Sequence, residues 1–550
     1  MKKFIKSLIF VLLLSIAMVF VGCGNEPEKK DDVPVDTGDP NNSNNEDPNG
    51  NTDDPVDPPA PTYTLSFKEK EITIATGERA VLEIETNITD TNAIVFKNSD
   101  NKVAAFQADG SIKGLKAGEA IITATYGELE ATVKITVTEE NKVYEKTDYR
   151  YWTNLLKTKY DVEEALMTQA QIDEFNNAVY SDYSKSKVYD LTKLPLTVSG
   201  QTVKNLINNY SNMNSYPVYK DSSTQASTAE KNAILENRNL SVLGSKDIEA
   251  SYGIIVNFAT MRSYPTLYIS VKNGQFQYDR FQETGLTVGE AVIIYHYSTD
   301  KEWCFVQAEN YIGWIQSENV AKCTADEFMK YYRSDKYMLC IAERMEIDGT
   351  VLRMGDKVPY KSVDENGFIA LMPKKCNDET LCITETLVPN DEKVNDGFMT
   401  YNYNNLYELG FKLLGTAYRW GDYMIDGRDC SSTQNAIYHC FGFVMPRNTS
   451  NQNKIPGYSS TVSGLNDTSM RTYPIGTLIF TSSHVMMYIG EDETGASYLL
   501  HNSGSCKLQT LSSYGGSNMI ATLTIRPKNW NNKIDNWFIN IYNQVVKWKL

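Results

Sequence analysis

The sequence predicts a multidomain protein in which several small β modules precede one α+β domain near the C-terminus. Three observations support this class. The 550 residues are more than a single hydrophobic core usually holds, so several domains are expected. Short alternating strands with turn signals recur over residues 62–139 and 241–392. After Cys430, apolar residues at helical spacing are followed by two apolar strands, which is the pattern of a mixed α+β domain.

The start of the chain indicates export. Three lysines among the first six residues precede an apolar run over residues 8–21, which is too short for a comfortable membrane span. The run ends in Phe-Val-Gly-Cys, so residues 1–23 resemble a bacterial lipoprotein signal. The resemblance implies a cleaved signal peptide and a lipid on Cys23, and a plain secretory signal is the alternative. Two or three acyl chains would anchor the protein to a membrane, because each buried CH₂ contributes about 0.8 kcal/mol.

Residues 24–61 differ from the rest of the chain in composition. Proline, aspartate, asparagine, glutamate and glycine dominate there, and such a segment cannot bury enough apolar surface to offset its ordering entropy. We expect a disordered acidic linker. The whole chain has 53 basic and 69 acidic residues and a formal net charge of −16, so nothing favours nucleic-acid binding through counterion release.

Residues 62–139 predict an all-β sandwich. Alternating apolar segments around Ile72 and Ile121 are bounded by turns that contain Gly77 and Gly118. The pattern resembles a bacterial immunoglobulin-like domain of group 2. Such a module serves as a spacer more often than as a binding domain, so the resemblance implies a spacer here.

Three further regions lie between this module and the C-terminal domain. Residues 140–240 are mixed with some helical periodicity. They resemble the amino-terminal stabilising region that precedes tandem SH3-like modules in related proteins, and the resemblance implies a helical stabilising region without a catalytic role. Residues 241–322 and 323–392 both resemble bacterial SH3-like barrels. Aromatic strands around Trp303 and Trp314 belong to the first barrel. Exposed aromatics form ligand grooves in some barrels, but a tryptophan at this spacing is more often part of the core.

The C-terminal domain, predicted over residues 393–550, carries the clearest chemical signal. Cys430 opens a helical pattern, and Asp429 before it is a good N-cap residue. A cysteine in the first helical turn lies beside unpaired N–H groups and the positive end of the helix dipole. Both favour the thiolate, so we expect a thiol pKa below the usual value of about 8.5. A nucleophilic thiolate also needs a base, and imidazole has the suitable pKa.

Only four histidines are available to act as that base. His296 lies in a predicted strand of an earlier module. His439 follows the cysteine by nine positions on the same helix, about 14 Å along the axis, so we expect it at the surface and out of reach. A hairpin with its loop at residues 491–494 would place His484 opposite His501, which would let one imidazole orient the other. A one-residue slip would separate them, so the sequence leaves the register open.

Five motifs surround these residues. They are Tyr418-Arg419-Trp420-Gly421, Asp429-Cys430-Ser431, Pro446-Arg447-Asn448-Thr449-Ser450-Asn451-Gln452, Gly476-Thr477-Leu478-Ile479-Phe480 and His484-Val485-Met486-Met487-Tyr488-Ile489-Gly490. In this order they resemble the NlpC/P60 family of cell-wall cysteine peptidases, over roughly residues 400–510. The resemblance implies a papain-like α+β fold for the catalytic domain.

The resemblance also implies a role for each matching position. Cys430 would attack a peptide carbonyl, His484 would act as general base and acid, and His501 would orient His484. Four other residues would bind substrate: Tyr418 near the nucleophile and the oxyanion, Asp429 and Ser431 beside the nucleophile, and Thr449 where serine is common. In family members selective for a free amino terminus, residues that flank the nucleophile help to bind that end.

Two positions depart from the family pattern. Gly421-Asp422 stands where the family often has two glycines, and Ser432 stands where glycine is usual. Neither change removes a catalytic group. We expect them to reshape the loop before the helix and so to alter substrate preference.

The cysteines predict neither a disulfide framework nor a metal site. If Cys23 is lipidated and Cys430 stays reduced, seven of the nine cysteines remain, an odd number. They are Cys304, Cys323, Cys340, Cys376, Cys382, Cys440 and Cys506. No Cys-x-x-Cys occurs, and Cys376 and Cys382 lack a second pair at zinc-site spacing. We expect Cys440 to be a buried inert thiol, and we expect no cofactor and no metal.

The expected function is hydrolysis of peptidoglycan stem peptides or muropeptides by an exported, lipid-anchored monomer, at the bond between γ-D-glutamate and the diamino acid. In related multi-module enzymes the first SH3-like barrel narrows the catalytic cleft. That arrangement would favour peptides with a free N-terminal L-Ala. Two alternatives stay open, an N-acetylmuramoyl-L-alanine amidase and a non-catalytic cell-surface binding protein.

Overall fold

The computed structural model describes residues 62–107, 110–138, 144–210, 213–462, 465, 467–481, 483–504, 517–522 and 544–546. The chain divides into two compact units, residues 1–140 and 141–550. The predicted lipoprotein signal, Cys23 and the acidic linker lie outside the described residues. In the described part of the chain, no helix is long and apolar enough to cross a membrane.

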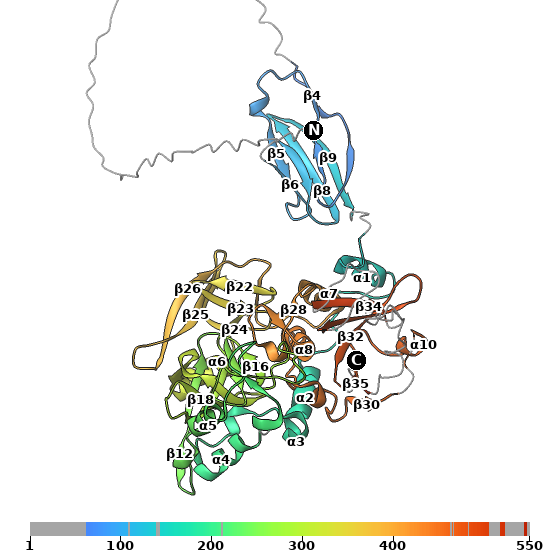
Figure 1. The fold of residues 1–550 in the computed structure, drawn as a ribbon. Coiled ribbons are helices and arrows are strands. Elements are labelled where there is room, and N and C mark those ends of the chain that lie inside the picture. The colour runs from blue at the N-terminus through green and yellow to red at the C-terminus, as the bar shows by residue number, and fades with distance from the viewer. Residues whose placement is uncertain are drawn as a thin grey trace, which may run out of the picture. The chain divides into compact units, whose positions relative to one another are not determined.

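The described part of unit 1 is built from strands (Figure 1). The strands are β1 (Leu65–Phe67), β2 (Glu71–Ala75), β3 (Arg79–Val81), β4 (Ile84–Thr86), β5 (Val95–Asn98), β6 (Ala104–Phe106), β7 (Ser111–Gly114), β8 (Gly118–Tyr126) and β9 (Leu129–Thr138), with the short 3₁₀ helix η1 (Thr91–Ala93). They form sheets in the orders β2-β9-β8-β5, β3-β7-β6 and β1-β4. Alternate residues of β9 (Val133, Ile135 and Val137) are buried in one core. The immunoglobulin-like assignment stays a prediction.

The region predicted to be helical packs against both the C-terminal domain and the first β module. Its helices are α1 (Tyr149–Leu156), α2 (Gln169–Ser181), α3 (Tyr183–Ser186), α4 (Gly200–Asn208) and α5 (Thr228–Asn237), with η2 (Leu191–Lys193), η3 (Met213–Ser215) and η4 (Leu240–Val242). Trp152 of α1 and Phe175 of α2 belong to the core of the C-terminal domain. Val203 and Ile207 of α4 belong to the core of the first β module. The region therefore joins the two.

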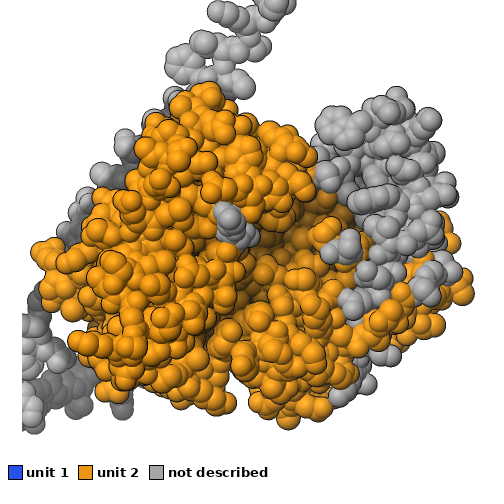
Figure 2. Space-filling view, turned by 60° about the horizontal axis from the view of Figure 1, so that its bottom comes forward, with its two compact units in different colours: residues 1–140 blue, residues 141–550 orange. Residues whose placement is uncertain are grey.

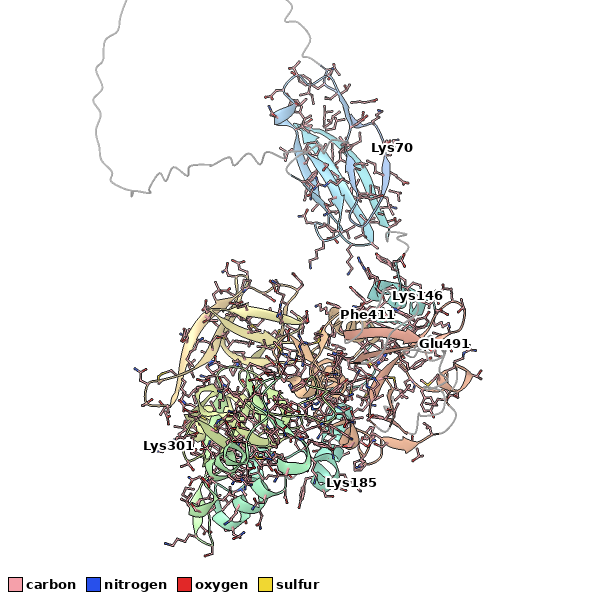
Figure 3. The ribbon with its side chains drawn as sticks, in the orientation of Figure 1. Lys70, Lys146, Lys185, Lys301, Phe411 and Glu491 are labelled. Carbon is pink, nitrogen blue, oxygen red and sulfur yellow. A yellow bond between two sulfur atoms is a disulfide. The ribbon has the colours of Figure 1, made fainter. Side chains whose placement is uncertain are left out.

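Lys146, labelled in Figure 3, joins this region to the C-terminal domain. Lys146, just before α1, donates to the Asp492 carboxylate and, at 3.1 Å, to the Tyr498 hydroxyl, both in the C-terminal domain. The Trp152 indole adds an edge contact with the ring of Tyr498, at 5.0 Å between centroids. The start of the helical region is thus fixed to the same hairpin that carries His501.

The first β module is one seven-stranded sheet in the order β16-β14-β19-β18-β17-β13-β20. Its strands are β13 (Ser251–Ile255), β14 (Ala259–Arg262), β16 (Gln282–Leu286), β17 (Ala291–Tyr297), β18 (Trp303–Gln307), β19 (Ile312–Gln316) and β20 (Val320–Cys323), and smaller pairs are formed by β10 (Thr197–Ser199) with β12 (Asp247–Glu249) and by β11 (Val218–Tyr219) with β15 (Ile269–Ser270). Trp303 and Trp314 are buried in the core, at 5% and 0% exposure. These two tryptophans therefore form no exposed groove.

The second β module follows η5 (Ser317–Asn319) and α6 (Ala325–Tyr332). Its strands are β21 (Tyr337–Cys340), β22 (Arg344–Ile347), β23 (Thr350–Arg353), β24 (Lys357–Asp364), β25 (Gly367–Lys375), β26 (Leu381–Val388) and β27 (Val394–Asp396), in the sheets β26-β25-β24-β21-β27 and β22-β23. Cys376 and Cys382 form a disulfide across the turn between β25 and β26. Among the cysteines that the structure describes, this pair forms a local crosslink that the sequence did not predict. The pairing of the adjacent strands β25 and β26 brings the two thiols together.

The C-terminal domain packs helices against an eight-stranded sheet in the order β29-β28-β34-β33-β32-β31-β35-β30. Its elements are α7 (Tyr403–Lys412), β28 (Ala417–Tyr418), η6 (Trp420–Asp422), β29 (Gly427–Arg428), α8 (Cys430–His439), α9 (Thr449–Gln452), β30 (Ser459–Thr461), α10 (Asp467–Met470), β31 (Leu478–Phe480), β32 (Val485–Glu491), β33 (Ser497–Ser503), β34 (Ser517–Thr522) and β35 (Gln544–Val546). Helix α8 contacts β32 and β33. The mixed α+β prediction agrees with this arrangement.

In Figure 1, the green and yellow strands of the two β modules lie on one side of α8 and the orange and red strands of the sheet lie on the other. Figure 2 shows that one face of this unit is hollowed. The helix that begins with Cys430 therefore lies where three parts of the unit meet.

The hairpin that carries the two histidines differs in register from the prediction. Strand β32 pairs Met487 with Leu500 and Tyr488 with Leu499, and a bulge follows Tyr488. The loop spans residues 492–496 instead of 491–494. Continued backward, this register places His501 level with Met486, two residues from His484 and on the same face of the sheet. The two imidazoles are therefore diagonal neighbours, not directly opposite.

Candidate active site

The start of α8 is fixed by a reciprocal N-cap. The Asp429 carboxylate accepts a hydrogen bond from the Ser432 N–H at 2.9 Å, and the Ser432 hydroxyl accepts one from the Asp429 N–H at 3.0 Å. Cys430 is the first residue of the helix, as predicted, and its side chain is largely buried, with the residue 6% exposed. The sequence therefore predicted the position of this thiol correctly.

The electrostatic state of the thiol differs from the prediction. Burial, and then the neighbouring Asp429 carboxylate, raise the pKa of Cys430 to about 11. A hydroxyl of Thr449, 3.7 Å from the sulfur, and the backbone N–H of Val485 act in the opposite direction but do not offset the burial. The expectation of a lowered thiol pKa is wrong for this site, because desolvation depends on tertiary packing that a helix start does not reveal.

The two predicted histidines contact each other beside this helix. His484 Nε2 lies 2.8 Å from His501 Nδ1. His484 immediately precedes Val485, whose N–H is directed at the Cys430 sulfur. Burial lowers the pKa of His484 to about 4, and burial followed by the charge of His484 lowers the pKa of His501 well below its usual value. Both imidazoles are therefore neutral at pH 7.

The remaining two histidines lie elsewhere. His296 in β17 is buried in the first β module, with Nε2 3.2 Å from the carbonyl oxygen of Arg238. His439 was expected at the surface, but it is partly buried, packs edge-on against the Phe398 ring and lines a cavity of about 600 Å³ behind α8. Burial lowers the pKa of His439 to about 3. The surface prediction is wrong because the second β module covers this face of the helix.

Tyr418 lies close to the nucleophile, as the resemblance implies. Burial raises the pKa of its phenol strongly, and the nearby Cys430 and Asp429 add to the effect. Its ring is 6.4 Å from the ring of Tyr278, which comes from the first β module. Tyr418 is thus near both the Cys430 thiol and a tyrosine of that module.

Asp429 and Ser431 accept hydrogen bonds from Arg447, for which the sequence predicted no role. Arg447 donates to both carboxylate oxygens of Asp429, at 2.8 and 3.2 Å, and to the Ser431 hydroxyl at 3.0 Å. Burial acts to raise the pKa of Asp429, but the Arg447 guanidinium holds it below its usual value. The Pro446-Arg447-Asn448-Thr449 motif was the signal that could have revealed this pair.

Two further residues reach the site from the first β module. The Tyr311 hydroxyl donates to the Glu283 carboxylate at 2.5 Å and lies 3.4 Å from the side-chain nitrogen of Asn448. Burial raises the pKa of Glu283 to about 7, and Arg447 is among the charges that oppose the rise. No local pattern could have indicated these residues, since they lie more than 100 residues before Cys430 in another module.

The other thiols and possible metal ligands add little to the site. Cys440 is buried, as its helical spacing predicts, and its thiol donates to the carbonyl oxygen of Ala436 at 3.3 Å. Cys506 lies outside the described residues. Within the residues that the structure describes, no group of three or more histidine, cysteine, aspartate or glutamate side chains could hold a metal ion.

A thiol at a helix start beside a pair of neutral imidazoles defines a candidate cysteine-hydrolase centre. Comparisons with known proteins agree with this class. Residues 415–525 match the NlpC/P60 family, and residues 268–316 match an SH3 domain of the SH3b1 type. These two segments of the chain are therefore similar to an NlpC/P60 domain and to an SH3 domain ahead of it.

Two solved structures resemble the chain, and the first shares its fold. An NlpC/P60 endopeptidase from Photobacterium damselae subsp. piscicida is 17% identical, with a TM-score of 0.58 over 74% of this chain and 98% of its own. An NlpC/P60 family protein from Bacillus cereus ATCC 10987 is also 17% identical, with a TM-score of 0.36 over 54% of this chain and 99% of its own. No curated protein matches the chain in sequence.

Proposed function

We propose that the protein is a cysteine peptidase in which Cys430 is the nucleophile, His484 the general base and acid, and His501 the residue that orients His484. The 2.8 Å contact between His484 Nε2 and His501 Nδ1 carries this proposal. That contact leaves Nδ1 of His484 as the ring nitrogen that would serve the thiol. The Val485 N–H at the sulfur supports it, because it brings the start of β32 to Cys430.

The protonation states define the order of the proton transfers. With pKa values of about 11 for Cys430 and about 4 for His484, both groups are uncharged at pH 7. The thiol proton would pass to His484 as the sulfur bonds to the peptide carbonyl carbon. The imidazolium would then protonate the departing amine and leave an acyl-enzyme. Water, deprotonated by His484, would hydrolyse the thioester and regenerate the thiol.

The developing oxyanion would be stabilised by groups that already border the thiol. Backbone N–H groups at the start of α8 and the hydroxyl of Tyr418 are our candidates. His501, 1% exposed, would keep His484 in one orientation and one tautomer through the cycle. No cofactor takes part in the mechanism that we propose.

We assign peptidoglycan stem peptides or muropeptides as the substrates, with cleavage between γ-D-glutamate and the diamino acid. The NlpC/P60 and SH3 matches support a substrate in the cell wall. We further propose that the protein acts outside the cell as a monomer and that a lipid on Cys23 holds it on the membrane. Export rests on the sequence of residues 1–23.

The site also supports a preference for peptides with a free N-terminal L-Ala. Asp429 is next to the nucleophile. Glu283 accepts a hydrogen bond from Tyr311, whose hydroxyl lies beside Asn448, and Arg447 acts on the charge of Glu283. A carboxyl group with a pKa of about 7 would lose its proton when an ammonium group arrives, because an adjacent cation favours the charged carboxylate. Ser431 and Thr449 would complete the binding surface around that end of the peptide.

A defined peptide tests the proposal. L-Ala-γ-D-Glu-diamino acid should be cleaved after D-Glu, and mass spectrometry of the products identifies the bond. Cys430→Ala should abolish cleavage, whereas Cys323→Ala, which removes a thiol in β20 away from the site, should leave it intact. Unchanged hydrolysis by Cys430→Ala would reject the proposed nucleophile. Equal rates on the N-acetylated peptide would reject the preference for a free amino end.

The same digest separates the alternatives. A muropeptide split between muramic acid and L-Ala would identify an amidase instead of an endopeptidase. Binding of the wall without release of any product, by a folded wild-type protein, would favour the non-catalytic surface protein.

A further inference from the structure

The two positions that depart from the family pattern contact each other. The Ser432 hydroxyl donates to Asp422 Oδ1 at 2.6 Å, and both residues are 4% exposed. Asp422 follows Gly421, and both have positive φ angles, of 52° and 59°. A left-handed conformation strains aspartate more than glycine, so the aspartate at this position needs compensating contacts.

Asp422 makes those contacts with the start of the catalytic helix. Its Oδ1 also accepts a hydrogen bond from the Asp429 N–H at 2.8 Å, and Arg447 Nη2 lies 3.6 Å away. The Ser432 hydroxyl in turn accepts from the same Asp429 N–H, at 3.0 Å. The Asp422 and Ser432 side chains thus share one backbone donor, directly before Cys430.

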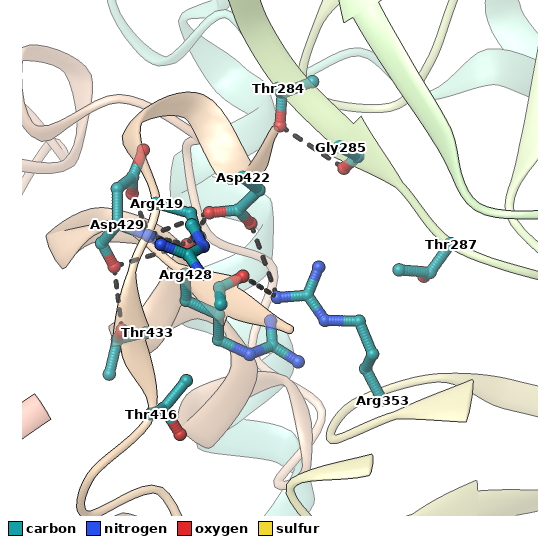
Figure 4. A network of polar contacts seen from close by, with 12 residues as sticks. Thr284, Gly285, Thr287, Arg353, Thr416, Arg419, Asp422, Arg428, Asp429 and Thr433 are labelled. Atoms are coloured by element: carbon teal, nitrogen blue, oxygen red, sulfur yellow. Dashed lines mark hydrogen bonds and ion pairs between the residues drawn. The ribbon is translucent and has the colours of Figure 1, made fainter. Parts of the chain in front are cut away.

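The second β module holds this loop from the other side (Figure 4). Arg353, 2% exposed, donates to the carbonyl oxygen of Gly427 at 2.7 Å and lies 3.9 Å from Asp422 Oδ2. Arg428 of the loop makes a hydrogen bond in the opposite direction, to the carbonyl oxygen of Met354 in the second module, at 2.9 Å. The side chains of Arg353 and Arg428 therefore connect β23 and its following turn to the loop that ends at Asp429.

We infer that Asp422 and Ser432 are a coupled pair of positioning residues, which together with Arg353 fix the first turn of α8 and with it the Cys430 thiol. The inference rests on the proposed function for its kinetic consequences. Neither side chain touches the thiol in the contacts described above. A displacement of about 1 Å at a nucleophile can lower a rate by about a hundredfold. The buried contacts of Asp422, Ser432 and Arg353, which we call the clamp, should therefore affect kcat.

A double-mutant cycle tests the coupling. Asp422→Gly and Ser432→Gly should each lower kcat by about tenfold with KM within about twofold, and the double variant should be no slower than the slower single variant. Single variants that retain the wild-type kcat, or effects that multiply in the double variant, would overturn the pair. If a glycine variant does not fold, Asp422→Asn and Ser432→Ala take its place. Ser432→Ala removes the donor of the bond, and Asp422→Asn weakens the acceptor by removing its charge while it still tolerates a positive φ angle.

Arg353 tests the part played by the second β module. Arg353→Gln should lower kcat by about tenfold, and Arg353→Lys should recover part of the loss because it restores a positive charge near Asp422. The matched control is Arg344→Gln, an exposed arginine of the same module, which should leave kcat unchanged. Equal kcat values for Arg353→Gln and the wild type would remove the second module from the clamp.

A measurement without substrate separates this inference from the proposed function. Amide hydrogen exchange over residues 427–436 should be faster in Asp422→Gly and Arg353→Gln than in the wild type, with exchange in α7 unchanged. If the wild-type protein cleaves no peptide but these variants expose the helix start, the proposed function fails and the clamp stands. If the exchange rates are equal, the clamp fails whatever the activity.

Discussion

The two β modules meet the same loop before α8, but they bring different chemistry to it. The first contributes Gln282, which donates to the carbonyl oxygen of Gly421 at 2.9 Å, and Thr284, which accepts from Arg447 at 2.6 Å. It also brings the hydrogen-bonded Glu283 and Tyr311 next to Asn448. The second contributes Arg353, whose partners are a backbone carbonyl and a carboxylate inside the protein. Under the proposed function, the first module would therefore affect which peptide binds, and the second would affect how firmly the start of α8 is held.

The contrast shows that a β module's fold does not define its role. Both modules are small β structures of similar length, and both lie against the NlpC/P60 domain. Their roles differ because of which edge faces the site. Glu283, whose carboxyl group has a pKa of about 7, lies on β16, the edge strand of the sheet in the first module.

The largest expected effect is on stability, at the arginine that joins the first module to the nucleophile. Arg447→Met should destabilise the protein by about 3–5 kcal/mol, because Asp429 would stay buried without its cation and Asp422 would keep only Arg353, at 3.9 Å. Urea unfolding measures the loss. Arg471→Met is the control, since its partner Glu491 forms a surface pair that contributes about 0–1 kcal/mol. A similar loss in both variants would mean that burial of the Arg447 network contributes nothing.

The next effect is a pH dependence from the first module. Burial raises the pKa of Glu283 from 4.5 to about 7, so between these values the folded state keeps a proton that the unfolded state has lost. The contribution of this group is therefore complete below pH 4.5 and disappears as the pH rises through about 7, up to about 3 kcal/mol in all. Glu283→Gln should reduce this fall. Unfolding curves at pH 4.5 and pH 8 measure it, and parallel curves for the variant and the wild type would contradict it.

How much of this comparison the sequence could predict depends on how local each feature is. The start of α8 at Cys430 and its Asp429 cap were predictable, because capping involves residues a few positions apart. The choice of His484 and His501 followed from four histidines and their strands. Their register was not predictable, because a bulge after Tyr488 shifts the hairpin.

Features that depend on packing between modules could not be predicted from the sequence. The burial of His439 and the raised pKa of Cys430 both arise where other elements cover α8. Glu283 belongs to a strand with no chemical motif of its own. The two departures, Asp422 and Ser432, were visible as departures, but their hydrogen bond needed the folded loop.

A smaller effect should appear in substrate binding. Glu283→Gln should raise KM for L-Ala-γ-D-Glu-diamino acid by about tenfold at pH 7.5, because the ammonium group loses a charged partner worth about 1–2 kcal/mol. The rate on the N-acetylated peptide should not change. Steady-state kinetics on the two peptides gives the comparison. The matched variant in the second module is Glu385→Gln, at a surface carboxylate that pairs with Lys361. Equal KM values for Glu283→Gln and Glu385→Gln would contradict a substrate role for the first module.

The smallest effect is expected at the outer face of the second module. Lys361 Nζ and the Glu385 carboxylate pair at 2.9 Å across β24 and β26, but the two side chains are 61% and 51% exposed. Solvent screens such a pair, so Lys361→Ala should change the free energy of unfolding by less than about 1 kcal/mol and leave kcat and KM unchanged. Urea unfolding and peptide kinetics measure both. The pair lies on β24 and β26, whereas Arg353, which bonds the loop before α8, lies on β23. A large loss of kcat in Lys361→Ala would therefore mean that the second module acts on the nucleophile through its outer sheet as well as through Arg353.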